Sequence, residues 1–433
     1  MQTDAMSAGP ERVCEPVRTT TIAFTPPLTS REPTGPVARR LLFYVPGYDP
    51  DSERRYRTLF LREIRRYAKV FGVPMPKVGC PTASEDGNRQ SWDVETGGGR
   101  TRTEYELLLW SDLVRRDMGK PRVVGIGLNA WATLNFAVNG TLAGLYRTSW
   151  KCANVMVYPF VGSLLLLMAL LVASFAGHGL LHHGFGLPGW FALLVGIVAS
   201  LVGLKFLAPR LDRAFLWQLM HDCVFHWQHA CGKRPDYDAR VEAFAAHMRD
   251  RIRESQADEV MIVGHSTGGL TAVELAVRLL AEDPTLGEAG GPVLSLLTLG
   301  SCLPIVALQP DARATRAAVA QLVTSRRLTW VDFQAPQDWM NFPGFNPARD
   351  LPLGLSEGEM ANPIIRSAKF AEIINRQTYE RIRLRPFRMH FQFLMANDHA
   401  GVFDIFALTL GPRSLRDRVL SEDTSLLDAP ATA

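Results

Sequence analysis

The hydropathy pattern of the chain is dominated by a stretch without Asp, Glu, Lys or Arg that runs from Cys152 to Leu204. Two apolar runs lie within it, at residues 155–176 and 187–204, and a short connector rich in glycine and histidine separates them. A helix of about 20 apolar residues crosses a hydrocarbon core of about 30 Å. The pattern therefore predicts a transmembrane helical hairpin within residues 151–210, with a buried helix pair of a soluble protein as the alternative.

Positive charges flank the two apolar runs on the same side. Arg147 and Lys151 precede the first run, Lys205, Arg210 and Arg213 follow the second, and the connector contains neither lysine nor arginine. Because loops rich in Lys and Arg stay on the cytoplasmic side, both flanking parts of the chain are expected there. We expect an integral membrane protein, and the Ala- and Arg-rich composition favours a bacterial inner membrane. Small residues along both runs would let the two helices pack closely against each other. The hairpin could also support a homo-oligomer.

Outside the hairpin, short apolar runs alternate with amphipathic segments. Strands are expected at residues 41–45, 102–110, 259–266, 292–300, 326–334 and 387–396, and helices at residues 52–70, 238–255 and 267–282. This alternation predicts an α/β fold in which helices flank both faces of a mostly parallel sheet. The hairpin would interrupt this one domain, whose two parts are residues 39–150 and 211–412. Residues 1–38 and 413–433 are expected to be flexible tails.

A short motif stands where one expected strand meets the next expected helix. The sequence GHSTG at residues 264–268 fits the pattern G-x-S-x-G, in which a strained turn exposes the serine hydroxyl. Ser266 is therefore the candidate nucleophile. The backbone N–H of Thr267, at the start of the helix, would stabilise an oxyanion, and a second donor is expected after the first strand, from Gly47 or Tyr48.

These residues resemble the α/β-hydrolase superfamily. The resemblance rests on FYVPGY at residues 43–48 and VGHSTGG at residues 263–269, together with an acid and a histidine downstream. It covers roughly residues 39–125 and 211–410, with the hairpin as an insertion. The resemblance implies an α/β-hydrolase fold and a serine esterase or lipase-like activity, in which the serine, the acid and the histidine follow one another in that order along the chain.

The resemblance implies that the acid follows the serine along the chain and that the histidine follows the acid. Only two histidines do so, His390 and His399. We favour His399, because it lies just beyond an expected strand, where catalytic loops of parallel sheets occur, whereas His390 lies within that strand. We favour Asp338, in an expected loop, over Asp332, which still belongs to a strand pattern. Asp398 is adjacent to His399 and would point elsewhere.

Composition narrows the remaining classes of function. The net charge is only +4 and the six cysteines are scattered, which argues against a dedicated nucleic-acid binder and against a disulfide framework. The glycine pattern at residues 123–130 lacks the βαβ context of a nucleotide site. The histidines and cysteines at residues 220–231 do not make a complete zinc ligand set. We therefore expect no cofactor and no metal. The long connection at residues 341–387 is a candidate lid over the nucleophile, with peripheral packing as the alternative.

The sequence favours a membrane-anchored serine hydrolase that cleaves carboxylic esters, with lipid-like or acylated substrates, through Ser266, His399 and Asp338. A thioesterase or an amidase would use the same three residues. The alternative from a different class is a catalytically silent scaffold with a hydrolase fold, which uses the hairpin to assemble with partners in the bilayer.

Overall fold

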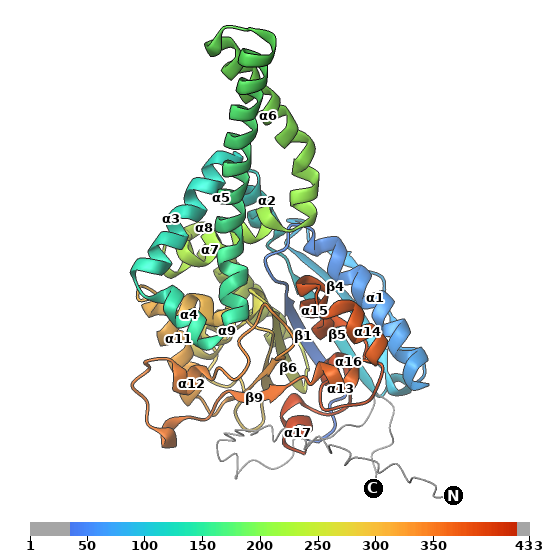
Figure 1. Ribbon diagram of the computed structural model, residues 1–433. Helices are drawn as coiled ribbons and strands as arrows, with labels where there is room; N and C mark the ends of the chain where they lie inside the picture. The colour runs from blue at the N-terminus through green and yellow to red at the C-terminus, as the bar shows by residue number, and fades with distance from the viewer. Residues whose placement is uncertain (1–34, 422–433) are drawn as a thin grey trace, which may run out of the picture.

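The computed structural model describes residues 35–421, and a nine-stranded sheet forms its centre (Figure 1). The strands follow the order β2-β4-β5-β1-β6-β7-β8-β9, and β3 pairs with β4. Their bounds are Arg39–Val45 (β1), Lys77–Val78 (β2), Thr82–Ala83 (β3), Arg89–Thr96 (β4), Thr101–Leu108 (β5), Glu259–His265 (β6), Val293–Leu299 (β7), Leu328–Gln334 (β8) and Ile364–Ser367 (β9). The strands from β5 to β9 in this order run parallel, and β2, β3 and β5 are antiparallel to β4. The predicted α/β class with a mostly parallel sheet is confirmed.

Strand β1 illustrates why the sheet is covered on both faces. Leu41, Phe43 and Val45 belong to one hydrophobic cluster, whereas Leu42 and Tyr44 belong to another. Successive side chains of a strand point to opposite faces of the sheet. A strand that is apolar at consecutive positions can therefore bury all of its side chains only between two layers of helices.

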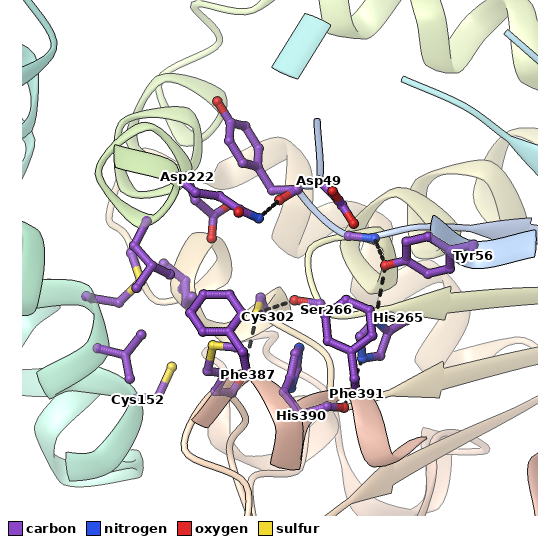
Figure 2. A pocket seen from close by; sticks show the side chains of 18 residues that line it. Asp49, Tyr56, Cys152, Asp222, His265, Ser266, Cys302, Phe387, His390 and Phe391 are labelled. Atoms are coloured by element: carbon purple, nitrogen blue, oxygen red, sulfur yellow. Dashed lines mark hydrogen bonds between the residues drawn. The ribbon is translucent and has the colours of Figure 1, made fainter. Parts of the chain in front are cut away.

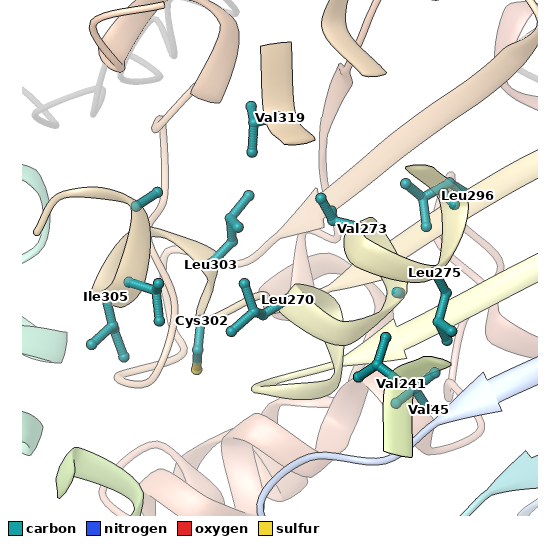
Figure 3. Close-up of a cluster of buried hydrophobic side chains, with 14 of the residues drawn as sticks. Val45, Val241, Leu270, Val273, Leu275, Leu296, Cys302, Leu303, Ile305 and Val319 are labelled. Atoms are coloured by element: carbon teal, nitrogen blue, oxygen red, sulfur yellow. The ribbon is translucent and has the colours of Figure 1, made fainter. Parts of the chain in front are cut away.

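Two groups of helices supply these layers. The first cluster, part of which is drawn in Figure 3, includes residues of α2 (Ser111–Met118), α3 (Arg122–Val138), α4 (Thr141–Thr148), α7 (Leu216–Ala230), α8 (Pro235–Glu254), α9 (Gly268–Glu282), α10 (Leu303–Ala307), α11 (Arg313–Thr324) and α12 (Pro347–Asp350). The second includes residues of α1 (Ser52–Phe71), α13 (Phe370–Ile373), α14 (Arg376–Ile382), α15 (Pro386–His390), α16 (Ile405–Leu410) and α17 (Leu415–Leu420). The sheet lies between these two layers.

Two long helices, α5 (Trp150–Gly179) and α6 (Gly189–Arg213), form a hairpin that projects away from the sheet (Figure 1). They are long and apolar enough to cross a membrane, and only 17% and 12% of their most apolar windows are buried. The helices approach closely where residues are small. A Cβ atom at Gly196 would lie 2.6 Å from the carbonyl oxygen of Ser174, and the hydroxyls of Ser174 and Ser200 are 3.1 Å apart.

The strand expected at residues 387–396 is not formed. These residues belong to α15 and to a 3-10 helix, Phe391–Leu394. Alternating apolar residues from Phe387 to Met395 favour a strand by their spacing. Pro386 instead occupies the first turn of a helix, where its fixed φ angle and missing N–H are tolerated. The local helix therefore replaces the expected strand, and the last strand of the sheet is β9.

Two boundaries also differ from the expectation. Residues 341–387 contain α12, β9, α13 and α14, and within this range only Phe387 lines the pocket beside Ser266. The expected C-terminal tail begins with the ordered helix α17, in which Leu415 and Val419 are buried. Most of the expected tails, at residues 1–34 and 422–433, lies outside the described residues.

Candidate active site

The turn that carries Ser266 has the geometry expected from its glycines. Ser266 follows β6 directly, and Thr267 separates it from α9. Its φ angle of 60° lies in the left-handed region, a strained conformation for a non-glycine residue that costs about 1–3 kcal/mol. The N–H of Ser266 donates to the carbonyl of Leu299 at 3.0 Å, and its carbonyl accepts from the N–H of Cys302 at 3.1 Å. These bonds hold the serine in its turn.

Glycines around this turn allow three pieces of backbone to approach one another. A Cβ atom at Gly264 would lie 2.4 Å from the carbonyl oxygen of Gly268, and one at Gly268 would lie 2.2 Å from the carbonyl oxygen of Val45. A Cβ atom at Gly47 would lie 3.0 Å from the Cβ of Ser266. The loop after β1 is therefore packed directly against the serine, as the sequence predicts.

A pocket lies beside the serine hydroxyl (Figure 2). Several parts of the chain line it. Among them are the loop after β1 with Gly47, Tyr48 and Asp49; the base of α5 with Cys152, Val155 and Met156; α7 with Gln218, Leu219 and Asp222; and α15 with the 3-10 helix after it, through Phe387, His390 and Phe391. The pocket thus lies at the carboxyl ends of parallel strands, where ligands of α/β sheets commonly bind. The base of the hairpin forms one of its walls.

The hydroxyl of Ser266 has a thiol as its nearest polar partner. Ser266 Oγ lies 3.5 Å from Cys302 Sγ, which also donates to the carbonyl of Met340 at 3.6 Å. Burial raises the pKa of the Cys302 thiol, so it remains protonated near neutral pH. Cys302 is therefore a neutral neighbour that orients the serine hydroxyl.

His390, which lines the pocket, forms a buried pair with Asp338 behind it. The Nδ1 atom of His390 lies 2.7 Å from Oδ2 of Asp338, and both side chains are at most 2% exposed. The same carboxylate accepts from the N–H of Met340 at 2.9 Å and from the amide of Asn341 at 3.0 Å. A carboxylate can only accept a hydrogen bond, so Nδ1 of His390 carries the proton that it donates to Asp338. In the neutral ring Nε2 is then a hydrogen-bond acceptor. The buried Nε2 has no hydrogen-bond partner within the described residues, and His390 lines the pocket with Ser266.

The expectation that His399 joins Asp338 and Ser266 is not met. His399 is exposed, and its backbone N–H donates to the carbonyl of Ile373 at 3.1 Å. It does not line the pocket, and Asp338 is bonded to His390 instead. His390 takes the place expected for His399 because the segment at residues 386–390 is a helix. In this helix His390 is buried, whereas His399 lies in an exposed loop. The proline before this segment was the sequence signal against a strand.

The other two acids considered are occupied elsewhere. Asp332 accepts from the hydroxyl of Thr298 at 2.5 Å and from the amide of Gln334 at 2.7 Å. Burial raises the pKa of Asp332 to about 6. Asp398 forms an ion pair with Arg66 and accepts from the N–H of Asn375. Of the acids considered, Asp338 is the one that meets a histidine beside Ser266, as the sequence analysis favoured.

Two backbone N–H groups near the serine are free to bind an anion. The N–H of Gly47 is already engaged, because it donates to the hydroxyl of Tyr56 at 3.1 Å. The N–H groups of Tyr48 and Thr267 have no hydrogen-bond partner in the part of the chain that the structure describes. Thr267 is also the N-cap of α9, where the helix dipole favours negative charge. Of the three expected oxyanion donors, the geometry favours Tyr48 and Thr267.

A chain of hydrogen bonds connects the walls of the pocket. The hydroxyl of Tyr56 lies 3.4 Å from Nδ1 of His265, and Nε2 of His265 lies 3.3 Å from the carbonyl oxygen of His390. Burial lowers the pKa of His265 well below its usual value, so its ring is neutral. A carbonyl can only accept, so Nε2 carries the proton and Nδ1 accepts from Tyr56. Together with the bond from Gly47 to Tyr56, this chain ties the loop after β1, the end of β6 and α15 together.

Asp222 is the pocket residue that sequence reasoning missed most completely. It belongs to α7, and Thr267 donates its hydroxyl to Asp222 at 3.2 Å. Burial raises the pKa of this carboxyl. No motif identifies Asp222, because α7 reaches the pocket through tertiary packing. Within residues 35–421 there is no group of three side chains suited to a metal ion.

The arrangement combines a strained hydroxyl, an imidazole with a free nitrogen, a buried carboxylate and two free N–H groups. These are the parts needed for nucleophilic attack on a carbonyl carbon.

No protein-family model, curated protein or solved structure matches this chain.

Proposed function

We propose that the protein is a membrane-anchored serine hydrolase that cleaves carboxylic esters. The observation that carries the proposal is the pair of His390 and Asp338: His390 has an unpartnered Nε2 and lines the same pocket as the strained Ser266. In this proposal the fold is an α/β-hydrolase fold. The nucleophile follows β6, the acid follows β8 and the histidine follows β9, which is the order typical of that superfamily.

The reaction begins when the hydroxyl of Ser266 rotates from Cys302 toward Nε2 of His390. The oxygen attacks the carbonyl carbon while His390 takes the proton, and Asp338 stabilises the imidazolium. The N–H groups of Tyr48 and Thr267 bind the oxyanion. His390 then gives the proton to the leaving alcohol, and an acyl group remains on Ser266. A water molecule releases the acid by the same steps and restores the hydroxyl.

The hairpin supports the membrane part of the proposal. Its apolar side chains are exposed along both helices, and exposed apolar surface of this size requires another apolar phase. Arg147 precedes α5, Lys151 is the second residue of α5, and Arg210 and Arg213 lie in the last turn of α6. These charges favour a cytoplasmic position for the α/β domain.

Helix α3 extends this apolar surface beyond the hairpin. Its exposed side chains include Val123, Val124, Trp131, Leu134 and Val138. Apart from Val123, which adjoins Val124, their spacings of three, four and seven residues place them on one face of the helix. A helix with such a face lies in the interfacial plane of a bilayer. We therefore infer that α3 rests on the same leaflet from which the hairpin inserts.

A fluorophosphonate probe, which reacts with activated serines, tests the proposal on the full-length protein in detergent. We expect labelling of the wild-type protein and none of the Ser266→Ala variant. Labelling should also be lost in His390→Ala and retained in His399→Ala. A wild-type protein that is folded but unlabelled would instead favour the catalytically silent scaffold. Matched ester, thioester and amide substrates then distinguish an esterase from a thioesterase or an amidase.

A further inference from the structure

A second cavity, of about 700 Å³, lies at the base of the hairpin next to the pocket of Ser266. We call it the hairpin cavity. It shares Val155, Leu219, Met340 and Phe387 with the pocket of Ser266, so the two spaces are neighbours across the same side chains. Its volume lies in the range of about 300–1,000 Å³ that is typical of ligand sites.

The hairpin cavity is lined by Asn154, by two arginines and otherwise by apolar and aromatic side chains, among them Phe215, Trp339 and Phe387. Arg385 and Arg388 also line it, both are exposed, and neither side chain has an acidic or hydrogen-bonding partner within the described residues. The cavity thus offers an apolar space together with two uncompensated positive charges.

The cavity stands at the level where α5 leaves the α/β domain. Tyr158 of α5 lines it, and the ring of Trp339 packs edge-on against Trp150 at 5.6 Å. Trp150 is 54% exposed at the first position of α5. Exposed aromatic rings at the end of a membrane-spanning helix are typical of the headgroup region. Tyr158 of α5 and Ala214 and Phe215 beyond α6 line the cavity where the hairpin joins the α/β domain, so insertion of the hairpin in the proposed way would bring the cavity near the headgroup region.

Two stacked aromatic side chains form part of the wall near the hairpin cavity. The rings of Phe215 and Phe387 stack with centroids 3.6 Å apart, and Phe387 faces both spaces. Phe215 connects α6 to α7 with a φ angle of 58°, a strained conformation for an aromatic residue. Phe387 thus links the stack with Phe215 to the wall that both spaces share.

We propose that the hairpin cavity receives an acyl chain of an anionic glycerophospholipid from the cytoplasmic leaflet, with its phosphate held by Arg385 and Arg388 and its ester carbonyl at Ser266. This inference rests on the proposed function and names the substrate class of the same site. Guanidinium groups bind phosphate oxygens through charge-assisted hydrogen bonds. In the reaction the ester bond breaks, the acyl carbon bonds to Ser266, and the lysophospholipid leaves with the proton from His390. Water then yields the fatty acid.

Lipid binding tests the inference without turnover. Full-length Ser266→Ala protein is incubated with mixed micelles of phosphatidylglycerol and phosphatidylcholine that carry the same acyl chains, and the co-purified lipid is quantified. We expect phosphatidylglycerol to be enriched about tenfold, and this enrichment to be lost when Arg385→Gln and Arg388→Gln are added. Glycerol phosphate, which shares the phosphate but lacks the chains, should not displace the lipid. Equal retention of the two lipids would overturn the inference.

Hydrolysis of vesicle lipids provides the second arm. The wild-type protein should release fatty acid faster from phosphatidylglycerol vesicles than from phosphatidylcholine vesicles, and the variant lacking both arginines should lose this preference. Its hydrolysis of a short water-soluble ester should stay unchanged. The matched control, Arg376→Gln with Arg383→Gln, removes two exposed arginines outside the cavity. An equal loss in this control would attribute the effect to general surface charge and overturn the site. Absence of hydrolysis of every ester, with lipid binding intact, would contradict the proposed function alone.

Discussion

The turn after β6 and the segment that connects β8 to α16 supply the two halves of the candidate active site, and their positions are specified in different ways. The turn depends on residues within a few positions of Ser266, because its glycines permit close backbone contacts at 2.4 Å and 2.2 Å from a hypothetical Cβ. The second segment brings Asp338 and His390 together across 52 positions of sequence. The first half is local in origin, and the second depends on how the whole domain packs.

This difference separates what a motif can identify from what it cannot. A strand, a serine in a strained turn and a helix follow from neighbouring residues, so G-x-S-x-G indicates the candidate nucleophile. The histidine has no comparable motif, because its position depends on how α15 packs against the second hydrophobic cluster. The predictions below test the two halves separately, and they begin with the largest expected effect.

Replacement of Ser266 by alanine should have the largest effect. Removal of the attacking oxygen should lower kcat for a short ester by about 10⁴-fold or more. The fold should persist, because the bonds that hold this turn come from the backbone of residue 266. Kinetics and a thermal melt of the same preparation measure both. Turnover near the wild-type rate in this variant would show that Ser266 is not the nucleophile.

The two histidines test the half that depends on packing. His390→Ala should lower kcat by about 10⁴-fold, because no other group supplies the base. His399→Ala should stay within about twofold of the wild type, since His399 is exposed and outside the pocket. The reverse result would restore the histidine that strand spacing favoured and would show that the pair of His390 and Asp338 is only structural.

The same distinction explains how much of the fold the sequence predicts. Strands β6, β7 and β8 and helices α1, α8 and α9 lie where the apolar patterns place them, because each has one clear period and a boundary rich in Gly, Pro or charge. The segment at residues 387–396 alternates like a strand, yet Pro386 and contacts with the second hydrophobic cluster make it helical. Tertiary contacts override a short pattern most readily when the run is brief.

Parts of the site without any pattern could not be predicted from one sequence. Asp222 and Cys302 reach the pocket from α7 and from the turn after β7. Neither belongs to a motif with a fixed spacing from Ser266. The sequence predicts two long apolar helices here, but their role as a wall of the pocket, through Cys152 and Met156, follows only from the packing of α5.

Asp338→Asn should come next in size. An asparagine at this position would orient the imidazole poorly and stabilise no imidazolium, so kcat should fall by about 10²–10⁴-fold. Asp332→Asn provides the matched control, because Asp332 contacts Thr298 and Gln334 and does not line the pocket. Equal losses in the two variants would indicate damage to the β8 end of the sheet, and no specific role for the pair with His390.

The hydroxyl of Tyr56 tests the connection between the two halves. Tyr56→Phe should leave the N–H of Gly47 and Nδ1 of His265 without a partner, at a cost of about 1–3 kcal/mol. Because His265 also holds the backbone of His390, kcat should fall by about tenfold. Tyr44→Phe is the control, since the buried hydroxyl of Tyr44 has no partner within the described residues. Identical behaviour of the two variants would show that the chain of hydrogen bonds does not support the base.

The smallest expected effect is the contribution of Asp332 to the free energy of unfolding, which should change with pH. Burial raises the pKa of Asp332 to about 6 from an ordinary 3.8, so between these values the native state binds more protons than the unfolded state. The free energy of unfolding should therefore fall as pH rises from about 4 to about 6, by up to about 3 kcal/mol. Asp332→Asn removes this contribution. The melting temperature of the wild type relative to the variant should accordingly drop by a few degrees between pH 4 and pH 7, while kcat at pH 7 stays the same. Asp404 has a similarly raised pKa, but it is present in both proteins and cancels in the difference. If the difference in melting temperature did not change with pH, Asp332 would be solvated in the native protein. Its contacts with Thr298 and Gln334 at the end of β8 would then be less well packed than the structure indicates.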